Sequence, residues 1–393
     1  MNRYPSAAII CRVVIIGAAG NVGKGILQTF CACSDTWDVI AIDPAFKEEE
    51  IVGTTGPSES KFKLNTRIKS KIEDIDDEIF QSWFFLPLGE NKHGHEYDKH
   101  HTTSQHHHHH IEIIVTNDNG NRDEYAVRPN LGSKNNSRFT KLMKRIVAAR
   151  ECYHKRQSDS SDCHKMMSIH VSYIGGSWTR LQSVNVQTQN NNRLEINDAS
   201  PVKEGGGSNP YEIAKSCAQA NAQQLSTQCK LGITFYDYIS VVPNFSTNFS
   251  VSRMTKSGLE KGIIKYSEGG YGRNLLHTKE AGEIVMRIVE TDIENSFQYS
   301  KQNLNVDEKK LFNTVLVPGH FITFKTFAEI TKEAIENKYK NKTIVFEAYE
   351  KTPDELRTHC TSLRESVNNS SCLVIDGLKE TAIFALKNHE EGL

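Results

Sequence analysis

Two residues spaced four apart, Tyr211 and Lys215, are the pair in this sequence best suited to acid–base chemistry. Both fall in a predicted helix from Tyr211 to about Gln228, so they share one helix face. A lysine ammonium beside a phenol stabilises the phenolate, which lowers the tyrosine pKa from its ordinary value of about 10. The phenol then exchanges a proton near neutral pH, as general acid–base catalysis requires. Because Y-x-x-x-K is frequent by chance, an ordinary amphipathic helix is the alternative interpretation.

A glycine-rich turn near the start of the chain supports the first interpretation. An apolar run from Ala7 to Ile16, typical of a strand, leads into Gly17-Ala18-Ala19-Gly20-Asn21-Val22-Gly23. A helical pattern from Gly23 to Cys33 follows. The first glycine allows the sharp turn, the second lets the backbone approach a pyrophosphate, and the third lets the helix pack close to the strand. The helix N-terminus then offers N–H groups to phosphates, so the pattern predicts a dinucleotide-binding turn.

An acidic residue stands where a dinucleotide fold needs one. The second predicted strand begins at Trp37 and ends at Asp43. A carboxylate about 20 residues beyond the glycines accepts hydrogen bonds from the adenosine ribose hydroxyls. The same carboxylate repels a 2′-phosphate, so Asp43 favours NAD over NADP. The alternative is a solvated acid at a strand end.

The elements that would position these residues alternate along the chain. The acidic segment Lys71–Asp77 is expected to close a third strand. Further strands are predicted at Ile111–Val115, Met167–Trp178 and Ile233–Val242, separated by helices such as Arg138–Arg150. Alternation of this kind favours a parallel sheet covered on both faces. We therefore expect an α/β fold with a Rossmann-type doubly wound parallel sheet and a smaller, mixed C-terminal substrate-binding region. We expect residues 1–242 to form the dinucleotide-binding domain and residues 243–393 mainly the second region, partly interleaved with the sheet.

Composition narrows the functional classes. The chain has 393 residues, with 47 basic and 48 acidic ones and a net charge of -1. The basic residues are scattered, so we expect no nucleic-acid partner. No apolar run is long enough to span a membrane and no leader pattern opens the chain, so we expect a cytoplasmic protein without a membrane partner. The nine cysteines lack the spacing of a disulfide framework and are expected to be free thiols.

One segment departs from this globular pattern. Residues 89–110 contain nine of the sixteen histidines, including the run from His106 to His110. Imidazole clusters bind transition metals, which leaves a His-rich metal carrier as one alternative function. A metal site also needs fixed geometry and support around its ligands, which a homopolymer run does not provide. We therefore expect a surface insertion and no metal site.

Taken together, these motifs resemble the short-chain dehydrogenase/reductase superfamily, in particular its extended branch of NAD-dependent epimerases, dehydratases and reductases. The resemblance spans most of the chain and is carried by the glycine motif Gly17–Gly23, Asp43, the adenine-contacting pair Asp74-Ile75, the pair Tyr211/Lys215, and the element Gly272–Ala281 in which Glu280 replaces the usual Asp.

The resemblance implies a mechanism. Lys215 would also hold the nicotinamide ribose, and Tyr211 would pass a proton to or from a substrate hydroxyl while hydride moves to or from NAD. Pro243, at the end of the sixth strand, would lie near the nicotinamide. The family also uses a Ser or Thr hydroxyl to orient the substrate oxygen. The matching position here holds Tyr173, and we expect Ser172 to supply the hydroxyl, with Tyr173 itself as the alternative.

Ser177 is a further alternative for that hydroxyl. The resemblance leaves the substrate open: a nucleotide sugar is the first expectation and a small hydroxyl or carbonyl metabolite the second. Asn244 and Arg273 match positions that contact nucleotide sugars in the branch, although both residue types are ordinary in turns and loops. Many relatives dimerise through the helices corresponding to Arg138–Arg150 and Tyr211–Gln228, so a homodimer is expected.

Two other functions remain open. The segment Gly17–Gly20 also resembles the opening of malate dehydrogenases, but the sequence shows no convincing mobile arginine loop. Some members of the superfamily keep the fold and the dinucleotide but act as sensors or scaffolds, and the doubtful serine keeps that alternative open. The pair Tyr211/Lys215 argues against both.

Overall fold

The structure of the chain is a computed structural model. It describes residues 9–33, 37–47, 66–84, 108–116, 125, 127–128, 130–158, 166–175, 210–237, 240–247, 249–267, 272–301, 311–317, 319–349 and 372–391.

A seven-stranded sheet forms the centre of the molecule, in the order β10-β6-β5-β4-β1-β2-β3, and every pairing in it is parallel. Its strands are β1 (Ile9–Ile16), β2 (Trp37–Ile42), β3 (Thr66–Ile68), β4 (His108–Val115), β5 (Met166–Ile174), β6 (Gly232–Asp237) and β10 (Phe312–Leu316). The chain moves outward in one direction from β1 to β3 and in the other from β4 onward. This reversal confirms the predicted doubly wound α/β fold, and it opens a crevice at the carboxyl ends of β1 and β4.

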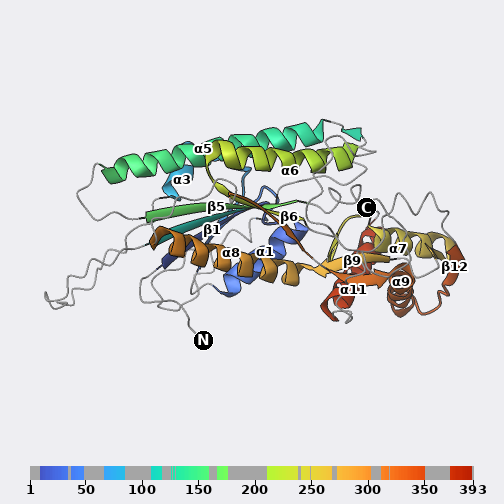
Figure 1. Ribbon diagram of the computed structural model, residues 1–393. Helices are drawn as coiled ribbons and strands as arrows, with labels where there is room; N and C mark the ends of the chain where they lie inside the picture. Colours follow the sequence, from blue (N-terminus) through green and yellow to red (C-terminus); the bar gives the residue numbers. More distant parts are fainter. Residues whose placement is uncertain are drawn as a thin grey trace, which may run out of the picture.

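Helices cover both faces of this sheet (Figure 1). The long helices α5 (Leu131–Ser158) and α6 (Pro210–Cys229) lie side by side on one face, with the short η1 (Ile72–Asp74) and α3 (Asp77–Ser82) near α5. The other face is covered by α1 (Asn21–Ala32) and α8 (Thr278–Lys301), which pack against each other. Each face has its own apolar core, as expected for strands buried on both sides.

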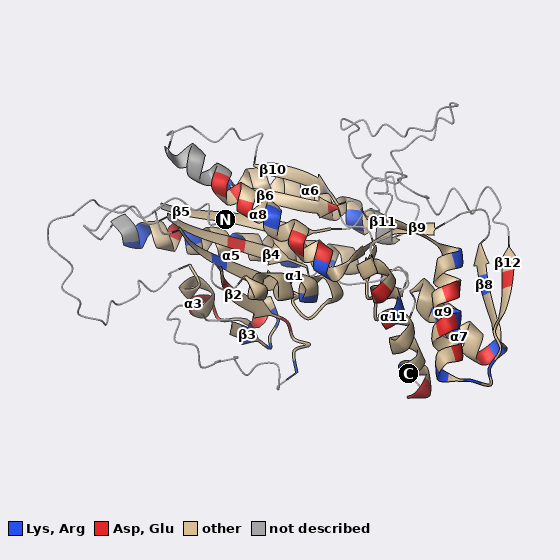
Figure 2. Cartoon of the chain, turned by 90° about the horizontal axis from the view of Figure 1, so that it is seen from below, with Lys and Arg blue, Asp and Glu red and all other residues tan. Residues whose placement is uncertain are grey.

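The C-terminal region builds two smaller sheets beside the main one (Figures 1 and 2). Strands β7 (Ser240–Val242), β9 (Gly272–His277) and β11 (His320–Thr323) form one, and β8 (Ile263–Ser267) pairs with β12 (Val345–Tyr349) in the other. The helices α7 (Ser250–Lys261), α9 (Phe324–Lys338) and α11 (Cys372–Glu390) pack together around them. Figure 2 shows acidic and basic residues interspersed along α7, α8 and α9 rather than separated by sign. The domain boundary at residues 242 and 243 stays a prediction; α8 and β10 follow it in sequence but belong with the main sheet.

Three predicted elements differ from the structure. The run Ile233–Val242 forms two strands, because β6 stays in the main sheet while β7 pairs with β9. The acidic segment 71–77, expected to close a third strand, forms η1 and the start of α3 instead. There the side chain of Asp76 accepts a hydrogen bond of 2.7 Å from the Glu78 amide and caps α3. The third strand is β3, which precedes this segment.

The third difference concerns the histidine run. His108, His109 and His110 form the first residues of β4, where they pair with Ile9, Ile10 and Cys11 of β1. The predicted insertion therefore ends before them, because β4 extends along the full length of β1. Residues 89–107 lie outside the described part of the chain.

A buried ion pair joins the first two strands to the segment after α3. Arg12 interrupts the apolar run of β1, and its side chain is only 9% exposed. Its Nε donates to Asp38 Oδ2 over 2.6 Å, and Nη1 donates to the Trp83 carbonyl over 2.6 Å. Since Arg12 and Asp38 are register partners in β1 and β2, the pair also fixes how these strands align.

We expect Asp38→Asn to lower the free energy of unfolding by about 3 kcal/mol, because it leaves a buried guanidinium without its counter-charge. Urea unfolding followed by circular dichroism measures the change. Glu347→Gln, which breaks the exposed Lys265–Glu347 pair between β8 and β12, is the matched control and should cost about 1 kcal/mol or less. Equal losses in the two variants would contradict the structural role of the buried pair.

Candidate functional site

The glycine turn after β1 has the geometry that its spacing predicts. Gly17 adopts a φ of 81°, in the left-handed region, and its amide donates to the Ile42 carbonyl of β2 over 2.9 Å. A Cβ on Gly23 would lie 2.1 Å from the Gly17 carbonyl oxygen, so helix α1 approaches the turn too closely for any side chain there. The third glycine is therefore required by packing.

The first turn of α1 points open amides at the carboxyl end of β1. The helix begins at Asn21 after Gly20, no side chain caps it, and its first turn contains no acidic residue. The amides of Asn21, Val22 and Gly23 precede the first amide with an intrahelical partner, since the Lys24 amide donates to the Gly20 carbonyl over 2.8 Å. Uncapped amides together with the positive end of the helix dipole suit a phosphate group.

Asp43 lies beside this turn, at the end of β2. Its Oδ2 accepts a hydrogen bond of 3.1 Å from the Ala19 amide within the glycine turn, and its Oδ1 accepts one of 2.7 Å from the Ala45 amide. Each carboxylate oxygen can accept a further hydrogen bond. The carboxylate is thus held rigidly next to the phosphate-binding turn, where a ribose hydroxyl could reach it.

Thr116 completes the support of the turn, and none of the sequence motifs described above includes it. Its hydroxyl lies 2.9 Å from the Ile16 carbonyl and 2.7 Å from the Gly17 carbonyl, so it holds the turn from the end of β4. The pairing of β1 with β4 brings these groups together across about 100 residues of sequence. Only the threonine directly after an apolar strand could have suggested this role.

The pair Asp74-Ile75 lies at the end of η1, with Asp74 exposed and Ile75 buried. Arg145 of α5 anchors the segment: its Nη1 donates to the Ile72 carbonyl over 2.7 Å and its Nη2 to the Ile75 carbonyl over 2.6 Å. The same guanidinium lies 4.4 Å above the Phe80 ring. Arg145 was missed by sequence reasoning, because nothing in a helical pattern marks which arginine reaches a distant loop.

Helix α6 carries Lys215 toward the sheet. Lys215 is 5% exposed and lies on the same stripe of α6 as Ala218, Ala222 and Leu225, which belong to the core beneath that helix. Position 211 is one turn earlier on this face. The side chain of Tyr211 lies outside the part of the molecule that the structure describes.

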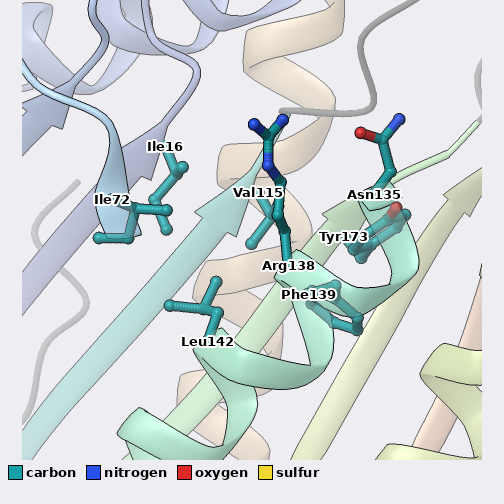
Figure 3. A pocket seen from close by; sticks show the side chains of 8 residues that line it. All are labelled: Ile16, Ile72, Val115, Asn135, Arg138, Phe139, Leu142 and Tyr173. Carbon is teal, nitrogen blue, oxygen red and sulfur yellow. The ribbon is translucent and has the colours of Figure 1, made fainter. Parts of the chain in front are cut away.

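A pocket between α5 and the sheet opens at the crevice (Figure 3). Its walls combine the ends of three strands with residues of η1 and α5: Ile16, Ile72, Val115, Asn135, Arg138, Phe139, Leu142 and Tyr173. Figure 3 shows the Arg138 guanidinium and the Asn135 carboxamide at one end, with Leu142 and Phe139 at the other. Apolar side chains form most of its walls, and the two polar side chains of α5 stand at its mouth.

Comparisons with known proteins identify the architecture. No protein-family model matches the sequence, and no curated protein matches it. A UDP-N-acetylglucosamine 4-epimerase from Methanobrevibacter ruminantium M1, solved with UDP-N-acetylmuramic acid, superposes with a TM-score of 0.55 at 14% identity, covering 97% of this chain and 100% of its own. A dTDP-glucose 4,6-dehydratase from Streptomyces venezuelae, solved with NAD, gives 0.54 at 12% identity, covering 97% and 98%.

A UDP-galactose 4-epimerase gives a TM-score of 0.51 at 12% identity, covering 96% of this chain and 99% of its own. The chain has the extended short-chain dehydrogenase/reductase fold. The three superpositions run over nearly the whole length of the chain, so the likeness includes the smaller C-terminal sheets as well as the main one.

Within this fold, the structure does not bring Ser172 to the crevice. Its hydroxyl points to the face of the sheet covered by α1 and α8, where it donates to Glu112 Oε1 over 2.6 Å, and the residue is fully buried. Lys215, a residue of α6, lies against the opposite face of the sheet. Tyr173, the next residue of β5, points to the α6 side, stacks on Phe235 with ring centroids 5.5 Å apart, and lines the pocket. Strand alternation separates Ser172 from Tyr173 in this way.

The remaining predicted positions are less telling. Pro243 is buried, and a Cβ on Gly377 of α11 would lie 3.1 Å from its nitrogen. Asn244 Oδ1 accepts from the Ser246 amide over 3.0 Å, as in an ordinary Asx turn. Ser177 and the side chain of Arg273 lie outside the described residues.

In the described ranges, no cluster of His, Cys, Asp or Glu side chains is arranged to hold a metal ion. No helix of the described ranges is long and apolar enough to cross a membrane.

Glu112, the partner of Ser172, is the centre of a buried polar cluster beneath α8. His170 Nδ1 lies 3.1 Å from its carboxylate and His110 Nε2 lies 3.2 Å from it. Asp292 of α8 is 3.8 Å from His170 Nε2 and forms the outer end of the cluster. A carboxylate without exposed surface is tolerated here because each of its oxygens has a donor.

These contacts shift the ionisation of the cluster. Burial acts to raise the pKa of Glu112, but the His170 charge and hydrogen bonds from both histidines outweigh it and lower the pKa from 4.5 to about 2. Burial acts to lower the pKa of His170, yet Glu112 and Asp292 raise it above 6.5. Burial raises the pKa of Asp292. The structure therefore favours an ionised Glu112 beside a protonated His170.

Two opposite pH dependences follow for folding stability. The lowered pKa of Glu112 contributes stability that is present above about 4.5 and is lost as the pH falls toward 2. The raised pKa of His170 contributes stability that is present below 6.5 and is lost as the pH rises through the raised value. Asp292 acts with the same sign at lower pH, because its raised pKa contributes stability that is present below 3.8 and is lost as the pH rises through the raised value.

We expect Glu112→Gln to lower the free energy of unfolding near pH 6 by about 3 kcal/mol, because it removes the ionised partner of His170. The difference from the wild type should shrink as the pH falls toward 2, where Glu112 itself begins to take up a proton. Urea unfolding at several pH values measures both quantities, and Glu347→Gln should follow the wild-type curve. A gap that stays constant across the pH range would show that the loss comes from packing rather than charge.

Proposed function

We propose that the chain is an NAD-dependent enzyme that oxidises or reduces a hydroxyl or carbonyl of a nucleotide sugar, as an epimerase, dehydratase or reductase. The observation that carries the proposal is the open first turn of α1, held beside Gly17 and Asp43 at the reversal of the sheet. This is the position at which open parallel sheets bind dinucleotides. The fold shared with sugar epimerases and dehydratases supports the same class of function.

The residues around the crevice fit NAD. The uncapped amides of α1 and the absence of a side chain at Gly20 suit a pyrophosphate, and Asp43 can accept hydrogen bonds from the adenosine ribose. The Asp43 carboxylate would repel the additional phosphate of NADP. Asp74 and Ile75 would contact the adenine, and Pro243 would lie near the nicotinamide. The related dehydratase was solved with NAD, which supports this choice.

Acid–base chemistry would come from α6. NAD, when bound, would accept hydride from the substrate carbon or return it. Tyr211 would take the proton of the substrate hydroxyl as that carbon is oxidised, and return it in the reverse step. Lys215 would lower the pKa of Tyr211 through its positive charge and hold the nicotinamide ribose. Burial of Lys215 at 5% exposure supports this role, because a low-dielectric surrounding strengthens its charge at short range.

We assign the substrate-orienting hydroxyl to Tyr173 rather than to Ser172. The two residues face opposite sides of the sheet, and Tyr173 lines the pocket on the side covered by α6. Ser172 is occupied by its hydrogen bond to Glu112. A phenol at this position reaches further than a serine, which would place the bound substrate oxygen farther from β5 than a Ser or Thr would.

The sensor or scaffold function remains the second candidate, since it needs the dinucleotide but not the chemistry. The cytoplasmic location, the homodimer through α5 and α6, and the sugar-nucleotide contacts of Asn244 and Arg273 stay predictions. Turnover of a substrate would distinguish an enzyme from a sensor.

We expect purified protein to bind NAD and NADH with micromolar dissociation constants and NADP more weakly, as measured by isothermal titration with a chelator present to mask the histidine run. Gly20→Val should abolish binding, because a side chain would occupy the space of the pyrophosphate. With a panel of UDP- and dTDP-hexoses, Tyr211→Phe should lower kcat by about 100- to 10,000-fold while NAD binding persists. Binding of NAD without any turnover across the panel would favour the sensor, and no binding would reject both.

The assignment of Tyr173 can be tested with one pair of variants. Tyr173→Phe removes only the hydroxyl and should lower kcat by about 10- to 1,000-fold, because an oriented hydrogen bond in the transition state is lost. Ser172→Ala, on the other face, should leave kcat within a few-fold of the wild type. The reverse ranking of the two variants would return the role to Ser172.

A further inference from the structure

Among the described residues that line the pocket, Arg138 is the only charged one. It lies on α5, one turn after Asn135, and its side chain is 43% exposed. In Figure 3 its guanidinium stands at the mouth of the pocket, level with the Asn135 carboxamide and beyond the apolar floor formed by Leu142 and Phe139. The cation therefore faces the crevice rather than the outer surface of α5.

The Arg138 guanidinium has N–H donors that its contact with Glu73 does not use. Its Nε lies 2.8 Å from Glu73 Oε1, which fixes the side chain against η1. Within the described part of the chain, its two terminal amino groups make no further hydrogen bond. An arginine has five N–H donors, and a single contact through Nε leaves the pair of amino groups oriented together. Such a pair matches two oxygens of a phosphate.

The groups around the crevice are mostly acidic, so a bound diphosphate would need a nearby cation. Three carboxylates, those of Asp43, Glu73 and Asp74, lie on the elements that border it. A dinucleotide brings a diphosphate with two further negative charges. The dipole at the start of α1 offers only about half a unit of positive charge, so it cannot balance these groups alone. Arg138 and Ile16, which precedes the glycine turn directly, line the same pocket, so a cation is available next to the turn.

We propose that Arg138 binds the diphosphate of the dinucleotide from the α5 side, opposite the amides of α1, and that Glu73 positions its guanidinium. This inference rests on the proposed function, because it takes a dinucleotide in the crevice as given. It adds a cofactor contact outside the glycine turn, from a residue that sequence analysis placed only in an ordinary helix. Bound this way, the diphosphate is held between a helix N-terminus and a guanidinium.

Isothermal titration with three ligands tests the inference: NAD, ADP-ribose and adenosine, which lacks phosphate. Arg138→Gln should weaken NAD and ADP-ribose about 10- to 100-fold, the usual loss for hydrogen bonds to a charged group, and leave adenosine unchanged. Arg138→Lys should weaken both nucleotides less, because it keeps the charge but not the paired donors. Lys141→Gln, which removes an exposed charge one turn further along α5, is the matched control and should bind all three ligands as the wild type does.

Each other result rejects the inference in a recognisable way. If Arg138→Gln binds NAD as tightly as the wild type, Arg138 does not contact the cofactor, while the proposed function stands. If adenosine weakens as much as NAD, the guanidinium contacts the adenine or ribose instead. If the wild type binds neither NAD nor ADP-ribose, the proposed function itself fails.

Discussion

The close approach of helix α1 to its surroundings is the constraint on which the site depends. A Cβ at Gly23 would lie 2.1 Å from the Gly17 carbonyl oxygen, and one at Gly25 would lie 2.1 Å from the Thr278 carbonyl oxygen. The helix is therefore pressed between the turn that precedes it and the start of α8. Because both contacts are to backbone, no rotamer change can relieve them. They fix the first turn of α1 directly over the end of β1, and its open amides with it.

The two faces of the sheet are packed differently. Under α5 and α6 the core is apolar up to the crevice, where Tyr173, Lys215 and Arg138 appear. Under α8 a polar cluster around Glu112 interrupts the apolar packing, and every member of it is paired with another. A charged cluster of this kind contributes little net stability over apolar packing, but losing one partner is costly. The same alternation of side chains along β5 serves both faces, which is why adjacent residues have unrelated roles.

Local sequence predicted most of what is local. The bounds of β1, α1, β2 and α6 agree with the predicted elements to within two residues, because apolar periodicity and the glycine turn determine them. The partners of each strand were not predictable. The apolar run that forms β6 and β7 is uniform in composition. It is split into two strands because its first half pairs with β10 in the main sheet and its second half pairs with β9 in the smaller one.

The sequence by itself determined the glycine turn, the acid at the end of β2 and the Tyr211/Lys215 spacing, since each depends on neighbours in the chain, and the alternation of strands and helices predicted the fold class. The tertiary structure decided which side of the sheet each side chain faces and which distant groups meet. Ser172 lies in the Glu112 cluster and not at the crevice. Thr116 contacts the glycine turn, Arg138 lines the pocket, and Arg145 contacts η1. Strand register and helix packing over separations of many tens of residues fix these contacts, and no local pattern carries that information.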